Sequence, residues 1–493
     1  MQTVRRLAGV LAVFALVTSG CGGTTAQIGT GASDLVPASA PAFIAVDTDP
    51  GSEQWQTVLR LADKFPDKEK GIASLERELR KDPGVDWEKD VKPALGAELD
   101  VAWLDFDHNG DNFVILTQPR DEAAFTRFVE KANKAQEKPS DRMASDRFRG
   151  WSLIAGNQAT IDRFKHASNS ASRTLSEEST FKRSMAKLGG DPIVRAYVNG
   201  DAVMEMVRKY GGRDIQPYVD KVGTLDWIAL RSGVKPNGVA LDTIVHGTPG
   251  KWFKGLHASE GFRPKLTDEA PQNALLYWTF HGVKGMLAGL EQNKLFQTPE
   301  FRPYHQALRD LDTLLQGENA FYIRSGNGRS RDVPFAIPEV TFVAAPGKDV
   351  NGARVLDKLL LRELQAIPDE TKIAGTSVRK LADGNGFGLY YANVDGRLVV
   401  TDLPAGIRGI KDGGKSLSES GTYKDAADAS GLPSKSQGFV FVNIHSSIPL
   451  VEKLAQQRVP NEIRRNLEPL DSAVQYAVTR THELQISFFL LLK

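Results

Sequence analysis

The chain contains little cysteine, no excess of one charge and few motifs of known chemistry. Its 493 residues include one cysteine, and 62 Lys and Arg residues balance 61 Asp and Glu residues. A lone cysteine excludes an internal disulfide, and no further thiol is available for catalysis. The balanced charge produces no overall basic field, so we predict no nucleic-acid partner.

Signatures of catalytic sites are also scarce. The eight histidines include no HExxH or other close ligand pair, and no G-x-S-x-G elbow occurs. We expect acid pairs such as Asp310 with Asp312, and Glu177 with Glu178, on solvated faces. We therefore predict that the protein is not an enzyme and has no catalytic residue, cofactor or metal ligand. An envelope-polymer hydrolase stays as an alternative, because a carboxylate pair assembled by the fold leaves no local signature.

The N-terminus combines a positive charge, an apolar run and the cysteine. Two arginines at 5–6 precede eleven apolar residues at 7–17, and residues 18–20 (Thr-Ser-Gly) lead to Cys21. This order is typical of a secretory signal peptide. The stretch resembles the lipobox of bacterial lipoproteins, although Thr18 stands where leucine is usual. The resemblance implies an acyl chain such as palmitate on Cys21.

An acylated Cys21 would explain why an exported protein keeps one unpaired cysteine. Two or three acyl chains anchor a protein stably where one does not. We therefore predict a signal peptide at 1–20, a flexible tether at 21–36, and a location at the cell membrane on the extracytoplasmic face. The alternative is an ordinary signal peptide followed by an incidental cysteine.

Two similar octets indicate an internal duplication. Residues 175–182 (LSEESTFK) return as 417–424 (LSESGTYK), with five of eight positions identical. Neighbouring segments recur in the same order: 197–199 (Tyr-Val-Asn) as 441–443 (Phe-Val-Asn), and 225–226 (Leu-Asp) as 470–471. Because collinear matches do not arise by accident, we predict a first repeat at 37–249, a joint at 250–270 and a second repeat at 271–493.

Each repeat alternates short apolar strands with amphipathic helices. Several strands are joined as hairpins, for example around 107–111 (Asp-His-Asn-Gly-Asp), where Asn-Gly is a strong turn signal. Parallel sheets need crossover helices between neighbouring strands, so hairpins favour antiparallel pairing. The predicted fold class is therefore α+β, with a mostly antiparallel sheet packed against helices in each repeat.

The whole pattern resembles a bacterial family of exported lipoproteins of unknown function (DUF3352-like). The matching features are the lipobox, the early strand at 41–46 (Pro-Ala-Phe-Ile-Ala-Val), the segment 113–119 (Phe-Val-Ile-Leu-Thr-Gln-Pro) and the octet with its Phe-Lys or Tyr-Lys ending. The resemblance implies an extracytoplasmic location. It supplies no activity and no catalytic residue.

Two further motifs have plain structural interpretations. Residues 409–416 (GIKDGGKS) match the P-loop pattern, but a helix is expected before them instead of a strand, so we predict a surface loop and no nucleotide. Residues 105–111 (DFDHNGD) begin like a calcium loop, but the twelfth position is Leu116 instead of a bidentate Glu. We predict the hairpin alone, with weak calcium binding as the alternative.

The octets themselves are predicted to be structural. Ser176 and Ser179, or Ser418 and Thr422, would cap the following helix, and Phe181 or Tyr423 would insert into the core. The leading functional prediction is a non-enzymatic, lipid-anchored protein that binds or scaffolds an envelope protein or lipid, with the membrane contacted through its acyl chains. A carrier of lipid or another apolar ligand in an internal cavity is the first alternative, and the hydrolase is the second.

Overall fold

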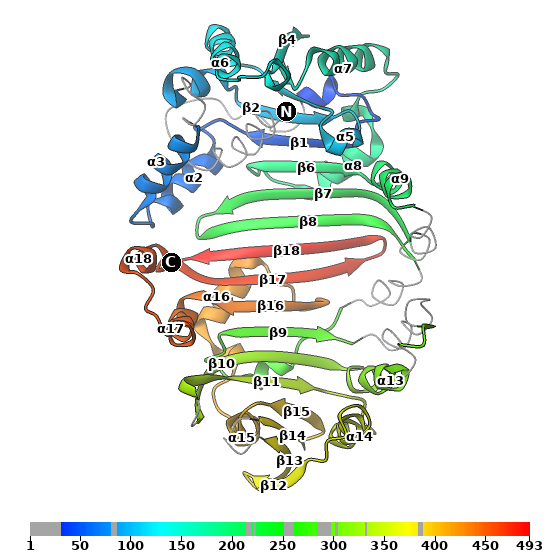
Figure 1. The fold of residues 1–493 in the computed structure, drawn as a ribbon, viewed down its shortest axis with the longest axis vertical. Coiled ribbons are helices and arrows are strands. Elements are labelled where there is room, and N and C mark those ends of the chain that lie inside the picture. The colour runs from blue at the N-terminus through cyan, green and yellow to red at the C-terminus, as the bar shows by residue number, and fades with distance from the viewer. Residues whose placement is uncertain are drawn as a thin grey trace. The chain divides into compact units, whose positions relative to one another are not determined.

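A computed structural model describes most of the chain after residue 30. The described residues are 31–79, 86–212, 219, 223–250, 261–282, 297–300, 304–330, 333–382 and 388–493. The predicted signal peptide and Cys21 lie outside them. The chain divides into two compact units, Met1–Thr248 and Pro249–Lys493, and Figure 1 shows a sheet with helices in each.

Unit 1 is built on an antiparallel sheet with the strand order β4-β5-β3-β2-β1-β6-β7-β8. The neighbouring strands from β4 to β7 in this order all pair antiparallel. Strand β8 returns beside β7 after a turn at 236–237, with Thr248 N donating to Thr224 Oγ1 at 3.2 Å. The strands are β1 (Ala42–Asp47), β2 (Glu98–Trp103), β3 (Phe113–Thr117), β4 (Ala144–Phe148), β5 (Trp151–Ala155), β6 (Val194–Asn199), β7 (Gly223–Lys235) and β8 (Gly238–Pro249).

Helices cover both faces of the central strands of unit 1. One core joins Phe43 and Tyr197 to η1, α7 and α8, and the other joins Val101 and Ile115 to η2, α4 and α6. Because β3 and β5 are buried on both faces, their sequences are continuously apolar or small instead of alternating. The helical segments are η1 (Ala32–Asp34), α2 (Glu53–Ala62), α3 (Lys68–Leu79), η2 (Trp87–Val91), α4 (Lys92–Ala94), α5 (Asp107–Gly110), α6 (Glu122–Lys134), η3 (Pro139–Asp141), α7 (Gln158–Ser170), η4 (Leu175–Glu177), α8 (Ser179–Leu188) and α9 (Gly200–Tyr210).

Unit 2 has the antiparallel order β12-β13-β14-β15-β11-β10-β9-β16-β17-β18. Its strands are β9 (Leu276–His281), β10 (Glu318–Ser330), β11 (Val333–Ala344), β12 (Asp369–Ile373), β13 (Thr376–Ala382), β14 (Gly388–Val394), β15 (Arg397–Thr401), β16 (Gly438–Asn443), β17 (Leu470–Arg480) and β18 (Glu483–Leu492). Its described helical segments include η5 (Leu266–Asp268), α13 (His305–Leu314), α14 (Gly352–Leu364), α15 (Pro404–Asp412), η8 (Leu417–Glu419), α16 (Gly421–Ser430), α17 (Ile444–Ala455) and α18 (Asn461–Leu467).

Apart from the β12–β13 hairpin, both units follow the same strand order along the chain, and matching strand pairs have the same register. Matching pairs are Phe43–Tyr197 with Tyr277–Phe441, Ala102–Val114 with Tyr322–Thr341, Val114–Ala155 with Thr341–Thr401, and Phe148–Trp151 with Val394–Arg397. We call two residues equivalent when they occupy such matching positions.

The predicted α+β class with antiparallel sheets is confirmed. Some predicted boundaries differ from the structure. Residues 31–36 are not tether, because Ala32 and Val36 are fully buried in the core of unit 1. Similarly, part of the predicted joint belongs to unit 2, since Leu266 and Ala270 are buried there. Strand β4 is half-exposed and has the polar sequence ASDRF, so it lacks an apolar pattern from which a strand could be predicted.

The residues around 107–111 connect β2 to β3 as an antiparallel pair, as predicted. The connection is not a tight Asn-Gly turn, however. It contains the short helix α5, and the indole of Trp103 donates to the carbonyl of Gly110 at 3.1 Å.

Both octets form the same local structure. Phe181 is buried and meets Tyr197 edge-on at 5.3 Å, and Tyr423 meets the equivalent Phe441 edge-on at 5.4 Å. The core role predicted for both rings agrees with these contacts. The observed caps are other residues than those predicted: capping boxes begin one residue before the octets, at Thr174 and Ser416, and Ser420 caps α16 by accepting from Tyr423 N.

Candidate functional site: a charged pocket in unit 2

A pocket of about 400 Å³ in unit 2 brings together four segments that are distant in sequence. They are the chain after η5, strand β10, the β14–β15 turn, and the end of α15 with the glycine loop that follows. The charged and aromatic lining residues are Asp268, Glu269, Tyr322, Arg324, Asp395, Arg397 and Lys415. This volume falls within the roughly 300–1,000 Å³ of typical ligand pockets.

Arg324 lines the pocket from β10 and is held by an ion pair. Its Nε and Nη2 donate to the two carboxylate oxygens of Glu339 at 2.7 and 2.8 Å. Glu339 is buried and lies directly across from Arg324 in the β10–β11 pair. A Cβ at Gly409 would lie 3.1 Å from Arg324 Nη2, so glycine there leaves room for the guanidinium beside α15. The bidentate pair presets the orientation of Arg324.

Arg397, at the start of β15, forms an ion pair with Glu269, which also lines the pocket. Burial raises the pKa of Glu269, and the nearby charges of Glu318, Asp268 and Asp395 raise it further, while Arg397 lowers it. The net direction is upward, because burial, the largest cause, and the three neighbouring carboxylates together outweigh the effect of Arg397. Tyr322 also lines the pocket, and burial raises the pKa of its phenol.

The P-loop-like stretch forms one wall of this pocket. Helix α15 precedes the loop, and Gly413 and Gly414 adopt φ values of 72° and 148°, which favour glycine. Ser416 is engaged in the capping box of η8, where its amide donates to Glu419 Oε2 at 2.8 Å. In a P-loop the hydroxyl of this serine binds Mg²⁺, whereas here Ser416 caps a helix. The interpretation as a surface loop agrees with this geometry, but the pocket was not foreseen.

Unit 1 fills the equivalent space with apolar side chains. The equivalents of the lining residues Glu269, Tyr322, Arg324 and Arg397 are Leu35, Ala102, Leu104 and Trp151. Ile410 corresponds to Phe164, since each is the seventh residue after the N-cap of its helix, α15 or α7. Trp151 and Phe164 are buried in the main core of unit 1. A Cβ at Gly31 would lie only 2.9 Å from the indole of Trp151, which shows how tightly that ring is packed. The shared fold therefore does not require a charged pocket at this place.

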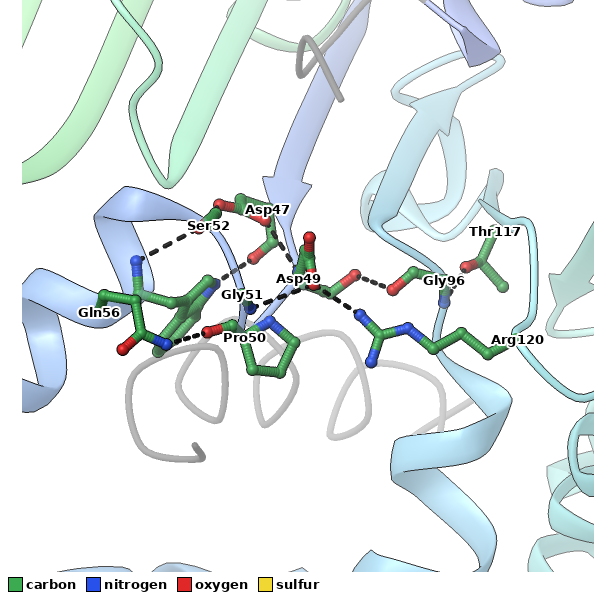
Figure 2. Close-up of polar contacts among 11 residues, drawn as sticks. Asp47, Asp49, Pro50, Gly51, Ser52, Gln56, Gly96, Thr117 and Arg120 are labelled. Atoms are coloured by element: carbon green, nitrogen blue, oxygen red, sulfur yellow. Dashed lines mark hydrogen bonds and ion pairs between the residues drawn. The ribbon is translucent and has the colours of Figure 1, made fainter. Parts of the chain in front are cut away.

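A second polar cluster lies at the end of β1 in unit 1 (Figure 2). One carboxylate oxygen of Asp47 accepts from the amide of Asp49 at 2.8 Å, and the other accepts from the hydroxyl of Ser52 at 2.5 Å. Asp49 accepts from Gly51 N at 3.1 Å and forms an ion pair with Arg120 at 2.8 Å. These bonds shape the turn that leads from β1 into α2, whose N-cap is Ser52.

Burial raises the pKa of Asp47 to about 6. Asp47, Asp49, Glu53 and Asp191 line a pocket of about 200 Å³. Both oxygens of Asp47 nevertheless accept hydrogen bonds from its own turn. The geometry therefore favours a structural role for Asp47, in holding the start of α2.

In the calcium-like loop at 105–111, the carboxylates of Asp105 and Asp107 bond to side chains of the protein itself. Asp105 accepts from Arg163 at 2.5 Å and Asn112 at 2.6 Å, while Asp107 accepts from Lys209 at 2.7 Å. Among the described residues, no group of three or more His, Cys, Asp or Glu is placed to hold a metal ion.

The acid pair in α13 was wrongly expected to be solvated. Asp312 is buried, and Asp310 forms an ion pair with Arg362 at 2.9 Å. Asp310 is only partly buried, and its partner Arg362 comes from α14, which packs against α13.

The sequence of the chain matches the family described as "Protein of unknown function (DUF3352)" over residues 3–488. The chain belongs to the DUF3352 family. No curated protein matches this DUF3352 chain. Two crystal forms of TP0453 are similar in part, with TM-scores of 0.24 and 0.23, 9% and 10% sequence identity, and coverage of 44% and 43% of this chain and 79% and 78% of theirs. Similarity at this level supports no functional argument.

Within the described part of this DUF3352 protein, no helix has the length and apolar character needed to cross a membrane. The candidate lipid-attachment residue Cys21 lies outside that part. Sequence reasoning missed Glu269, Arg324 and Arg397. One signal could have pointed to Arg397: when the two halves are aligned, it stands where Trp151 stands, at the start of a largely apolar strand.

Proposed function

We propose that this DUF3352 protein is an exported, non-enzymatic binding protein whose unit 2 pocket holds a small polar component of the cell envelope. The observation that carries the proposal is the difference between the equivalent sites. Unit 1 fills the space with Trp151 and Phe164, whereas unit 2 has a pocket of about 400 Å³ with Arg397 and Glu269 in its lining. Charged groups in a recess are costly to desolvate, so their presence favours a role in binding.

A tandem duplication would account for this arrangement. The shared strand order, the matching registers and the two octets support it. In this proposal unit 1 keeps the packed form of the repeat, while unit 2 has acquired the pocket. One copy then provides a stable framework, and the other provides the site.

Membrane attachment through Cys21 completes the proposal. An extended chain spans at most about 3.6 Å per residue, so the segment between Cys21 and Ala32 reaches no more than about 40 Å. An acyl anchor on Cys21 would therefore keep unit 1 close to the membrane surface on the extracytoplasmic side. The sequence features of residues 5–21 support this part of the proposal.

Native mass spectrometry tests the binding function. The purified chain is incubated with the low-mass fraction of an envelope extract, and bound species are then released and weighed. We expect a ligand that binds the wild type and Arg408→Ala but not Arg397→Trp, since Trp should fill the pocket as Trp151 fills unit 1. Arg408 is an exposed cation on α15 outside the pocket, and it serves as the control. Binding that is equal in all three proteins would reject the pocket.

The hydrolase alternative has one supporting observation. Asp47 and Asp49 line the same small pocket, and a pKa of about 6 for Asp47 suits a general acid. Release of soluble fragments from purified cell-wall polymer by the wild type, but not by Asp47→Asn, would establish that alternative. The alternative of a carrier for an apolar ligand has no such support. Asp or Glu residues line both pockets described above, and they also line a third pocket at Asp105 and Lys209.

A further inference from the structure

The unit 2 pocket presents several unused hydrogen-bond donors. Arg324 uses Nε and Nη2 on Glu339, with Nη2 also 3.3 Å from the carbonyl of Ala405, whereas its Nη1 has no partner among the described residues. Arg397 pairs with Glu269 through Nη1, and its Nε and Nη2 make no hydrogen bond in the described part of the chain. The Nε–Nη2 edge of Arg397 and the Nη1 group of Arg324 therefore remain available to an anionic group, which arginine binds well through N–H donors.

Carboxylates lie in the same pocket. Asp268 and Asp395 both line it, and both lie close enough to Glu269 to disfavour its ionisation. Asp395 also lies 3.5 Å from Lys411, which is a long and exposed ion pair. An ammonium group placed between Asp268 and Asp395 would relieve the repulsion among the three carboxylates.

The charges of the pocket are therefore mixed and nearly balanced. Arg324, Arg397 and Lys415 oppose Asp268, Glu269 and Asp395 within one small recess. A purely anionic ligand would be repelled by the carboxylates, and a purely cationic ligand would be repelled by the arginines. A molecule with both charges a few bonds apart satisfies both sets.

We infer that the pocket binds a small zwitterion of the amino-acid or short-peptide class, with its carboxylate at Arg324 and Arg397 and its ammonium at Asp268 and Asp395. This inference rests on the proposed function, because it names the ligand class of the same site. Lys415, on the exposed glycine loop, is a third cation in the lining of the pocket.

Isothermal titration of the full chain with alanyl-alanine and its blocked forms tests the inference. N-acetyl-alanyl-alanine lacks the ammonium, and alanyl-alanine amide lacks the carboxylate. We expect alanyl-alanine to bind at least about tenfold more tightly than either blocked form, a difference of about 1.4 kcal/mol. Equal affinity for alanyl-alanine and one blocked form would overturn the zwitterion inference, as would no heat of binding at millimolar dipeptide.

Variants connect the binding to the pocket. Arg397→Gln and Lys415→Ala should each weaken alanyl-alanine binding at least about threefold, and Arg408→Ala should leave it unchanged. Lys415 is exposed, so its replacement should not disturb folding. Unchanged affinity in both pocket variants would overturn the assignment. A different result would reject the proposed function: no species from the envelope fraction binds the wild type. If an envelope ligand binds but alanyl-alanine does not, only the zwitterion inference is rejected.

Discussion

Replacing Asp100 with alanine should stabilise unit 1, although Asp100 lies in the middle of its sheet. The side chain is fully buried on β2, and its strand neighbours in register are Ala45 and Leu116. Among the described residues, no donor reaches either of its carboxylate oxygens. Glu98, two residues earlier on the same face, is close enough to hydrogen-bond to it once either carboxyl is protonated.

Unit 2 shows that the fold accepts alanine at this position, because Ala320 is the equivalent residue. A buried polar group without a full set of partners costs about 1–3 kcal/mol. The lost packing of one carboxyl group offsets part of the gain. We therefore expect Asp100→Ala to raise the free energy of unfolding by about 1–2 kcal/mol at pH 8.

The gain should depend on pH. Burial and the neighbouring Glu98 charge raise the pKa of Asp100 well above its usual value of 3.8. A raised carboxyl pKa contributes stability that is complete below about pH 4 and is lost as pH rises through the folded-state pKa. The alanine variant lacks this contribution, so its advantage over the wild type should be larger at pH 8 than at pH 5.

Urea unfolding at both pH values, followed by tryptophan fluorescence and far-UV circular dichroism, measures this difference. Asp100→Asn is the matched control, since it keeps the volume and a buried polar group but cannot ionise. It should lose the pH dependence and gain less stability than Asp100→Ala. Destabilisation of Asp100→Ala by about 1 kcal/mol or more at pH 8 would refute the reasoning, because it would mean that the carboxyl has a strong partner.

Three further predictions concern the octet, the turn after β1 and the N-terminus. Phe181→Ala should lower the free energy of unfolding by about 3–5 kcal/mol, and Tyr423→Ala should lower it by less because Tyr423 is only half-buried. An unchanged melting temperature in Phe181→Ala would argue against a core role for Phe181. The pKa of Asp47, raised to about 6 by burial, should make the wild type about 1 kcal/mol more stable at pH 5 than at pH 7.5, and Asp47→Asn should flatten this dependence in urea titrations. Metabolic labelling with palmitate should disappear in Cys21→Ala, and label that persists in this variant would place the acyl chain elsewhere.

Local features of the sequence predicted much of the fold. The early strand predicted at 41–46 is β1 at Ala42–Asp47, within one residue at each end, because its apolar run is a local property of the sequence. Strand β4 escaped prediction because an edge strand with one exposed face has no clear apolar pattern. The segment η1 escaped because its small residues are buried only by contact with residues far along the chain.

The candidate site could not be predicted in the same way. Glu269, Arg324, Arg397 and Lys415 come from four separate segments, and no motif joins them. The one motif that contributes, at 409–416, resembles a nucleotide loop and was rightly interpreted as a surface loop. Its position beside Arg324 depends on how α15 packs on the sheet.

The sequence by itself determined the elements, the collinear halves and the aromatic residues that anchor each octet, since these depend on residues close together in the chain. Tertiary structure decided which side chains share a space. Trp151 and Arg397 follow equivalent turns on equivalent strands, yet one closes the core of unit 1 and the other lines a pocket in unit 2. The difference arises because cavities form where the volumes of distant side chains fail to fill the packing space between them.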